Sequence, residues 1–307
     1  MGQVNTCSAI PLRRVGLDTM VSRMAQDLAG KTFIVTGANT GIGKVSAKEL
    51  ARRGARVVLA CRSKAKTEPV IEEIKKETGN DQVDFVALDL SDLKSVRACA
   101  EQLLAREPKI HGLINNAGLV AKRGAKTSDG YQMTFATNHL GHYLLTRLLL
   151  DRMKQSGGAR IVNVSSQSHY QAKQIDWDAV TQPNKTVVGM KEYAVSKLAN
   201  VLFTKELARR LEGSGVTAYA VHPGVVATDV WRRVPPPFRW IMKKWMITPE
   251  EGAQSTLVCA TDPELAAQSG RYYTVGGKEK RPSKLADDTQ LAETLWTKSA
   301  EWTGLPA

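Results

Sequence analysis

A tyrosine and a lysine, Tyr193 and Lys197, stand four residues apart in a stretch with helical character. Residues at this spacing share one face of a helix, so the two side chains should lie side by side. A phenol with an ordinary pKa of about 10 exchanges protons poorly at neutral pH. A neighbouring ammonium favours the phenolate and should lower that pKa, so that Tyr193 can give a proton to a carbonyl oxygen or take one from an alcohol. The pair alone is common in proteins and is a weak signal.

Two hydroxyls, those of Ser165 and Ser166, end an apolar run that begins at Ile161. If this run is a strand, a hydroxyl at its end could hydrogen-bond the oxyanion that develops beside Tyr193. On residue type and spacing alone, either serine could take this role.

A glycine-rich segment follows the first apolar run and precedes a helical pattern. Its glycines have a G-x-x-x-G-x-G spacing. A turn without side chains lets backbone N–H groups and the positive end of a helix approach a pyrophosphate. A glycine-rich turn without function is the alternative. The candidate cofactor-binding residues of this turn are Gly37, Asn39, Thr40, Gly41, Ile42 and Gly43.

The second apolar run ends in Cys61, Arg62, Ser63 and Lys64. In dinucleotide-binding proteins an acid at this point binds the ribose hydroxyls of NAD, whereas an arginine accommodates the extra phosphate of NADP. Here Cys61 replaces the acid, and Arg62 offers a planar fork for phosphate oxygens with Lys64 as support. A solvated surface charge is the alternative for Arg62, and its place after the second strand favours NADP(H).

Polar and glycine residues also follow the third, fourth and sixth apolar runs, at the edge where a ligand would bind. Helix caps and turns are the alternative, because Asp and Asn are common in both. The candidates for cofactor contact are Asp89, Leu90, Asn116, Gly118, Pro223, Gly224, Val226 and Thr228.

Short apolar runs rich in valine and isoleucine alternate with amphipathic helical patterns, such as 44–53 and 92–106, from Lys31 onward. This alternation is typical of βαβ units in a parallel sheet. We predict an α/β protein with one domain at 29–307, a Rossmann-type doubly wound parallel sheet of about seven strands with helices on both faces, after a leader at 1–28. Ligands should bind beyond the carboxyl ends of the strands. The predicted strands are Thr32–Thr36, Arg56–Cys61, Val83–Leu88, Gly112–Asn115, Arg160–Ser165, Thr217–His222 and Arg271–Thr274.

Six motifs occur in one order and together resemble the short-chain dehydrogenase/reductase family over residues 28–306. The resemblance implies that Ser166 rather than Ser165 is catalytic with Tyr193 and Lys197. It adds Asn138 as a fourth catalytic residue that holds the lysine through water. A polar residue inside a helix, tolerated if its hydrogen bonds are satisfied, is the alternative for Asn138.

The same resemblance implies roles for the other strand ends. Asp89 and its neighbouring backbone would contact adenine, the Asn116–Gly118 segment would pass close to the ribose, and the segment 223–228 would hold the nicotinamide carboxamide. The segments 36–44, 60–62, 138–142 and 196–203 are most similar to the NADP-using retinol dehydrogenases. That branch implies a lipophilic aldehyde or ketone as substrate. The chain departs from it at 189–192 and by lacking an initial membrane-spanning helix.

The chain has 307 residues and a net charge of +13, which favours anionic partners such as a phosphorylated cofactor or an anionic membrane surface. No nucleic-acid-binding motif is present, so we expect no nucleic-acid partner. The four cysteines, Cys7, Cys61, Cys99 and Cys259, lack metal-ligand spacing, and we predict no metal site and reduced thiols. No apolar run is long enough to span a bilayer, and charged residues replace the apolar stretch of a signal peptide.

Two features predict peripheral membrane contact. The chain begins with Gly2 in a myristoylation pattern, with Cys7 placed for a second acyl chain. The segment 231–246 reads as a basic amphipathic helix, within a substrate lid near 229–250. Coincidence in a short pattern and a helix packed on the core are the respective alternatives. We expect residence on the cytoplasmic face of the endoplasmic reticulum or a lipid droplet, whereas Asp18 and Asp27 weigh against a mitochondrial leader.

The sequence thus predicts an enzyme that transfers hydride between NADP(H) and a lipophilic carbonyl or alcohol. Two alternatives remain: an oxidative steroid or retinol dehydrogenase, and a non-catalytic nucleotide-sensing scaffold. Because proteins of this family often form oligomers through helices that flank the sheet, homo-oligomerisation is a further expectation.

Overall fold

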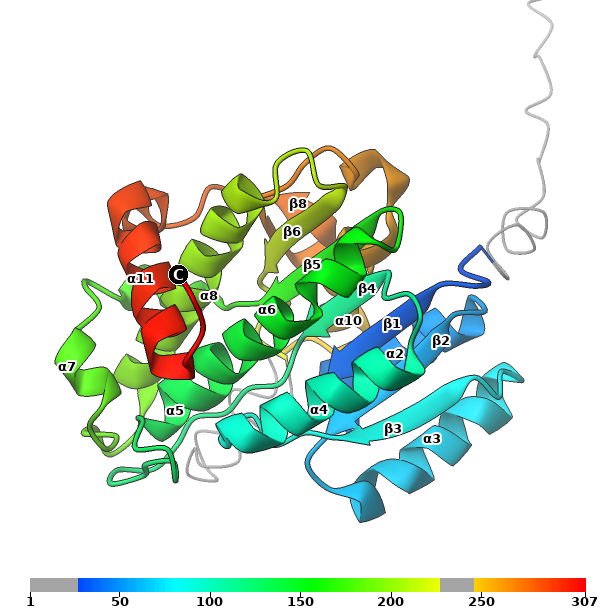
Figure 1. The fold of residues 1–307 in the computed structure, drawn as a ribbon, viewed down its shortest axis with the longest axis horizontal. Helices are drawn as coiled ribbons and strands as arrows, with labels where there is room; N and C mark the ends of the chain where they lie inside the picture. Colours follow the sequence, from blue (N-terminus) through cyan, green and yellow to red (C-terminus); the bar gives the residue numbers. More distant parts are fainter. Residues whose placement is uncertain (1–26, 227–245) are drawn as a thin grey trace, which may run out of the picture.

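The structure of the protein is a computed structural model, in which residues 27–226 and 246–307 are described. Its centre is one sheet of eight strands in the order β3-β2-β1-β4-β5-β6-β7-β8 (Figure 1). The first seven strands run parallel, and β8 pairs with β7 in the antiparallel direction. The strands are β1 (Thr32–Thr36), β2 (Arg56–Cys61), β3 (Val83–Ala87), β4 (Gly112–Asn115), β5 (Ala159–Val164), β6 (Val216–Val221), β7 (Tyr272–Thr274) and β8 (Lys278–Glu279).

The predicted doubly wound sheet is confirmed, but its strand count was one too low. All seven predicted strands are present, with ends that differ by one residue at most. The eighth strand, β8, has only two residues, and both are charged and exposed. A segment this short and polar lacks the apolar alternation by which a strand is recognised in a sequence.

Helices cover both faces of the sheet (Figure 1). One apolar core lies between the sheet and the helices α4, α6 and α8, and a second lies between the sheet and α2, α3 and α10. The α-helices of four or more residues are α2 (Gly41–Arg52), α3 (Lys64–Thr78), α4 (Leu93–Arg106), α6 (Gly141–Lys154), α7 (Trp177–Val180), α8 (Met190–Arg210), α10 (Pro249–Thr261) and α11 (Thr289–Thr303). The three-residue α5 (Met133–Phe135) and the π-helix η1 (Ala136–Leu140) precede α6.

The local sequence explains where the main helices begin and end. Asp92 caps α4 by accepting hydrogen bonds from the backbone of Lys94 and Ser95, so the helix starts one residue after the predicted one. Thr248 and Glu251 form a capping box at the start of α10. The predicted lid near 229–250 and the basic amphipathic segment 231–246 fall almost wholly outside the described residues, as does the leader 1–26.

Candidate active site

A cavity of about 740 Å³ opens at the carboxyl ends of the parallel strands. This is the edge at which a doubly wound sheet binds its ligands. The structure brings most of the predicted site residues to its wall: Gly37, Asn39, Thr40, Gly41, Ile42, Arg62, Asp89, Leu90, Asn116, Gly118, Ser166, Tyr193, Lys197, Pro223, Gly224 and Val226. Of the others, Gly43, Lys64 and Asn138 do not line it, and Thr228 lies outside the described residues.

The glycine-rich turn runs from the end of β1 into α2. Gly37 and Gly41 have positive φ angles of 64° and 55°, which other residues rarely adopt. Gly43 is set back from the cavity, and its role is packing: a Cβ there would lie 2.5 Å from the Asn116 amide nitrogen. Thr40 precedes α2 without a side-chain cap. The N–H groups of the first helical turn therefore keep their capacity to bind an anion.

The end of β2 combines a buried thiol with an exposed cation. Cys61 is buried, and burial raises the pKa of its thiol, so this position carries no negative charge at neutral pH. The Arg62 side chain is 75% exposed, and its guanidinium lies 4.0 Å from the Asp89 carboxylate. Lys64, predicted to support Arg62, instead pairs with Glu68 on the same helix at 3.4 Å.

Lys66, which the sequence analysis did not single out, takes the place predicted for Lys64. It lies on the first turn of α3 and lines the cavity with Arg62. Lys64 and Lys66 both lie on the first turn of α3. Which of them faces the cavity depends on how α3 packs on the sheet. Leu119, Val120, Thr137, Gln167, Ser168 and Gln171 were also missed and line the cavity.

The residues that follow β3 and β4 line the cavity and also make hydrogen bonds that hold the local turns. The Asp89 carboxylate accepts hydrogen bonds from the backbone and the hydroxyl of Ser91, at 2.9 and 2.6 Å. The Asn116 amide donates to the carbonyl of Thr36 at 2.8 Å. Both side chains therefore hold turns, as the alternative interpretation foresaw, while their residues also face the cavity.

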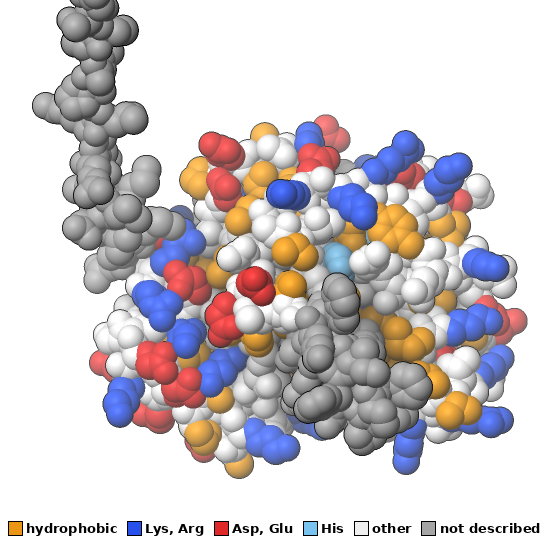
Figure 2. All heavy atoms as spheres, turned by 180° about the vertical axis from the view of Figure 1, so that it is seen from behind, with side chains coloured by type: hydrophobic (Ala, Val, Ile, Leu, Met, Phe, Trp, Pro, Cys, Tyr) orange, Lys and Arg blue, Asp and Glu red, His pale blue; other side chains and the backbone are white. Residues whose placement is uncertain are grey.

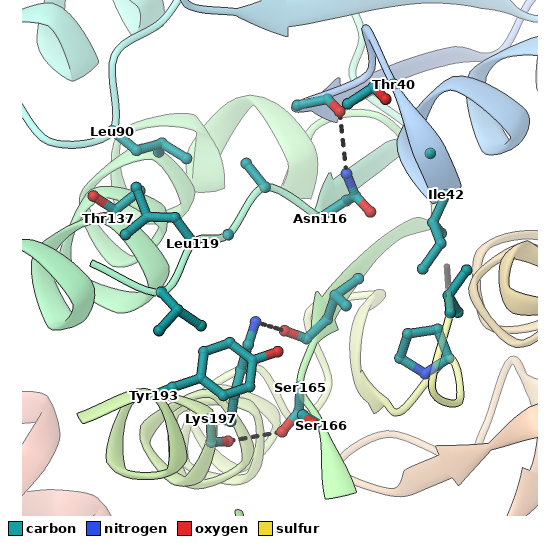
Figure 3. A pocket seen from close by; sticks show the side chains of 18 of the residues that line it. Thr40, Ile42, Leu90, Asn116, Leu119, Thr137, Ser165, Ser166, Tyr193 and Lys197 are labelled. Atoms are coloured by element: carbon teal, nitrogen blue, oxygen red, sulfur yellow. Dashed lines mark hydrogen bonds between the residues drawn. The ribbon is translucent and has the colours of Figure 1, made fainter. Parts of the chain in front are cut away.

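Tyr193 and Lys197 project from α8 toward the cavity beside the end of β5 (Figure 3). The Lys197 ammonium donates to the carbonyl of Val164 at 2.8 Å. The two serines differ in their surroundings. Ser165 is buried and its hydroxyl donates to the Lys197 carbonyl at 2.7 Å, whereas Ser166 is half-buried, lines the cavity and acts to lower the pKa of Tyr193. The geometry therefore favours Ser166, the serine that the resemblance implied.

Burial shapes the proton chemistry of this pair. It raises the pKa of Tyr193 to about 12, although the hydrogen bond from Ser166 acts in the opposite direction. It lowers the pKa of Lys197 to about 8. The expected net lowering of the tyrosine pKa is not met in this structure, because burial of the phenol raises it. The Lys197 ammonium lies 5.5 Å from the centroid of the phenol ring. Tyr193 is therefore a protonated donor at neutral pH.

Asn138 lies behind the cavity wall, in the π-helix η1, and is fully buried. Its amide nitrogen donates to the Leu119 carbonyl and to the Ser196 hydroxyl, both at 3.0 Å, and its amide oxygen accepts from the Leu119 N–H at 2.8 Å. A Cβ placed on Gly118 would lie 3.4 Å from both the Asn138 oxygen and the Lys197 nitrogen. Asn138 thus approaches the lysine beneath Gly118, and its predicted catalytic role remains a proposal.

The chain belongs to the short chain dehydrogenase family, whose pattern it matches over residues 31–237. It is 47% identical to retinol dehydrogenase 12 of Mus musculus over 91% of this chain and 88% of that protein. It is 46% identical to retinol dehydrogenase 11 of Homo sapiens, over 97% and 93% of the two chains. Human retinol dehydrogenase 13 is 45% identical over 91% and 86%. The predicted similarity to the retinol dehydrogenases is confirmed.

Solved structures share the fold. An uncharacterised protein from Mycobacterium paratuberculosis superimposes with a TM-score of 0.75 and 34% identity, over 93% of this chain and 98% of that one. A putative NAD(P) dependent gluconate 5-dehydrogenase from Beutenbergia cavernae, with bound NADP, gives a TM-score of 0.67 and 29% identity over 81% and 96%. The chain is thus an oxidoreductase of a family that binds nicotinamide cofactors.

Proposed function

We propose that the protein uses NADP(H) to interconvert lipophilic carbonyls and alcohols, and that it acts as a reductase. The observation that carries the proposal is the buried, protonated Tyr193 hydroxyl beside Ser166 and Lys197, on the wall of a cavity that also contains the glycine-rich turn. A scaffold that only binds nucleotide would not need a proton donor in this place.

The residues present fit a nicotinamide dinucleotide. The uncapped start of α2 and the turn from Gly37 to Gly41 can hold a pyrophosphate, and the cavity continues from there to Tyr193. When bound, the nicotinamide supplies the hydride to the carbonyl carbon. Tyr193 gives its proton to the carbonyl oxygen, while the Ser166 hydroxyl hydrogen-bonds that oxygen and orients it. Lys197 stabilises the phenolate left on Tyr193, through its positive charge.

The charges at the end of β2 support NADP(H) over NAD(H). Arg62 and Lys66 give two cations at the cavity wall, and the uncharged Cys61 stands where an NAD-binding protein has an acid. A 2′-phosphate would displace Asp89 from Arg62, since their 4.0 Å contact at an exposed side chain is weak.

Apolar side chains support a lipophilic substrate. Leu119, Val120 and Val225 line the cavity. Val187 and Val188 are 73% and 66% exposed and directly precede Gly189, which packs against Val120. These two valines are thus exposed apolar side chains next in sequence to a residue packed on the cavity wall. The names of the retinol dehydrogenases similar to this chain agree with a lipophilic substrate.

Peripheral attachment to the cytoplasmic face of a membrane is part of the proposal and rests on the exposed valines and on Gly2 and Cys7 in the leader. Among residues 27–226 and 246–307, no helix combines the length and apolar character needed to cross a bilayer. Lys and Arg side chains are interspersed with Asp and Glu over the face in Figure 2. The described surface on this face therefore offers no single basic patch, and attachment would depend on acylation and apolar contact.

A panel of aldehydes and ketones, including all-trans-retinal and long-chain aldehydes in detergent, tests the reaction with NADPH and NADH separately. We expect turnover with NADPH and lipophilic carbonyls. Tyr193→Phe should reduce kcat by about 10³-fold while the affinity for NADPH stays the same. Tyr131→Phe, which removes a phenol bonded to the Trp302 carbonyl, is the matched control with normal kcat. Full activity of Tyr193→Phe would refute its role, and a nucleotide-saturated protein inert on the whole panel would favour the scaffold.

The coenzyme preference is tested by Arg62→Asp. This change places a carboxylate where it can bind ribose hydroxyls and removes the cation for the phosphate. We expect the ratio of kcat/KM for NADPH and NADH to reverse. Lys64→Ala is the control, because Lys64 does not line the cavity, and it should leave the ratio unchanged. An unchanged preference in Arg62→Asp would contradict phosphate binding by this arginine.

A further inference from the structure

A buried histidine, His142 on α6, links two parts of the site that come from different strands. The side chain is 2% exposed. Its Nε2 lies 2.9 Å from the hydroxyl of Thr36, the last residue of β1. Its Nδ1 lies 3.1 Å from the carbonyl oxygen of Asn138. Neither the motifs nor the proposed chemistry gives this histidine a role.

The hydrogen bonds around His142 determine which of its nitrogens carries the proton. The Asn138 carbonyl can only accept a hydrogen bond, so His142 Nδ1 must be the donor of that bond. The Thr36 hydroxyl accepts from the backbone N–H of Ala117 at 3.0 Å and shares the N–H of Asn116 with the Ile114 carbonyl. Its own hydrogen can be donated to His142 Nε2 at 2.9 Å, which is nearer than the Ile114 carbonyl at 3.3 Å. His142 Nε2 is therefore an acceptor, and Nδ1 carries the hydrogen that is donated to Asn138.

The same surroundings keep the imidazole uncharged. Burial lowers the pKa of His142 to about 3, and the positive charge of Lys197 acts in the same direction. A neutral ring with its hydrogen on Nδ1 satisfies both partners at once. The protonated ring would place a hydrogen on Nε2, so Thr36 could no longer donate to it, and the hydroxyl already accepts from the backbone at Ala117 and Asn116.

Each end of this chain of hydrogen bonds holds one half of the site. Thr36 directly precedes the glycine-rich turn, and its hydroxyl holds the segment 116–117 by accepting hydrogen bonds from two backbone N–H groups. Asn138 binds both backbone groups of Leu119 and the hydroxyl of Ser196, and Ser196 in turn donates to the carbonyl of Tyr193 at 2.8 Å. His142 thus lies between the cofactor turn and the helix that presents Tyr193.

We propose that His142 is a positioning residue which, as the neutral Nδ1–H imidazole, holds the cofactor-binding turn through Thr36 with one nitrogen and the Asn138 support of Tyr193 with the other. The effect on turnover rests on the proposed function, whereas the tautomer and the hydrogen bonds do not.

Two polar replacements separate the two contacts. His142→Asn keeps an amide donor near the position of Nδ1 but cannot reach Thr36, and His142→Gln keeps an acceptor near the position of Nε2 but loses the donor to Asn138. We expect His142→Asn to raise the KM for NADPH about tenfold with kcat within about threefold, because the Thr36 hydroxyl loses its nearer acceptor and is left with the Ile114 carbonyl at 3.3 Å. His142→Gln should instead lower kcat and leave the KM for NADPH nearly unchanged. His142→Phe should both raise the KM and lower kcat. Equal losses in the Asn and Gln variants would overturn the assignment of one contact to each half of the site.

The matched control is His111, a second buried histidine at the amino ends of the strands, whose Nδ1 accepts from the Thr32 N–H at 3.0 Å. His111→Phe should lower the unfolding midpoint and leave kcat and KM unchanged. Thr36→Ser should restore the NADPH affinity that Thr36→Val loses, because serine keeps the hydroxyl. Failure of serine to restore it would contradict the assignment of the Thr36 hydroxyl.

The tautomer can be measured without any substrate. Long-range ¹H–¹⁵N NMR of the wild-type protein, with His142 assigned from the His142→Gln spectrum, should show a protonated Nδ1 and an unprotonated Nε2 across neutral pH. A protonated Nε2 would overturn the proposal. If no carbonyl is turned over by the wild type, the proposed function fails, and the NMR and NADPH-binding results still decide the inference on His142.

Discussion

Two cations at opposite ends of the sheet are held in contrasting ways. Arg56, at the amino end of β2, makes two hydrogen bonds of 2.7 Å to Glu107 and one of 2.9 Å to Asp84. These carboxylates raise the pKa of Arg56. Lys197, at the carboxyl end of β5, is fully buried, and within the described residues its ammonium hydrogen-bonds only the carbonyl of Val164. Burial lowers its pKa to about 8.

The difference shows which end of the sheet serves stability and which serves chemistry. The paired charges at the amino end satisfy each other, and Glu107, the buried member, keeps its charge paired with Arg56. The carboxyl end leaves Lys197 without a carboxylate, so its charge remains directed at the cavity and at Tyr193. A carboxylate beside Lys197 would stabilise the fold and weaken its effect on the phenolate. Sites that carry reactions often lower stability in this way.

The largest effect should come from removing the charge at the carboxyl end. Lys197→Met should reduce kcat by about 10³-fold. It should also raise the free energy of unfolding at neutral pH by about 3 kcal/mol, because the wild type must keep an ammonium buried. Carbonyl turnover and urea unfolding measure the two effects. A variant that loses both activity and stability would break the comparison.

Glu107→Ala tests the amino end. The Glu107 side chain is 1% exposed, and its loss leaves Arg56 with Asp84 alone. We expect the free energy of unfolding to fall by about 1–2 kcal/mol, because Arg56 is partly exposed and keeps Asp84 as a partner, with kcat unchanged. Urea unfolding and steady-state kinetics provide the measurements. A large fall in kcat would mean that the two ends are not separate in function.

The pH dependence of stability sharpens the contrast. The folded-state pKa of Lys197 is depressed, so the unfolded chain binds an extra proton between about pH 8 and 10.5. The cost of burying the ammonium is complete below about pH 8 and is lost as the pH rises toward 10.5. The stability gap between Lys197→Met and the wild type should therefore shrink by more than half between neutral pH and about pH 9.5. A constant gap in urea unfolding would contradict the lowered pKa.

The smallest effects should come from two glycines with similar φ. Gly79 follows α3 at the amino end with φ of 69°, and a Cβ there meets nothing within 4 Å. Gly79→Ala should cost about 1 kcal/mol of backbone strain and leave kinetics unchanged. Gly37 has φ of 64°, and a Cβ there would lie 2.8 Å from the Ala117 side chain. Gly37→Ala should cost more stability than Gly79→Ala and also raise the KM for NADPH. Equal effects of the two substitutions would show that the close approach to Ala117 is unimportant.

The sheet and most of the cavity could be predicted because they depend on local patterns. Buried parallel strands are continuous apolar runs, and the residues that follow them reach one edge whatever the details of packing. Arg62 and Asp89 were found on this basis, whereas Tyr193 was found from its spacing to Lys197 and Ser166 from the family resemblance.

What could not be predicted depends on tertiary packing. The pKa of Tyr193 depends on how completely other elements bury it, which residue spacing does not show. Whether Lys64 or Lys66 lines the cavity depends on how α3 is rotated about its own axis against the sheet. The π-helix around Asn138 inserts a wider turn into what reads as a regular helix, and its sequence, 136–140, has no distinguishing pattern. The role of His142 became visible only when Thr36 and Asn138 were placed on either side of it.

The short outer strand β8 bears on how this protein behaves at high concentration. An unprotected sheet edge exposes N–H and C=O groups on which a second chain can build, and this is a common start of aggregation. Here the outermost strand offers only two residues, Lys278 and Glu279, both charged and exposed, and it runs against the direction of its neighbours. A strand from another molecule would find too little backbone to pair with, so this edge resists the growth of intermolecular sheets.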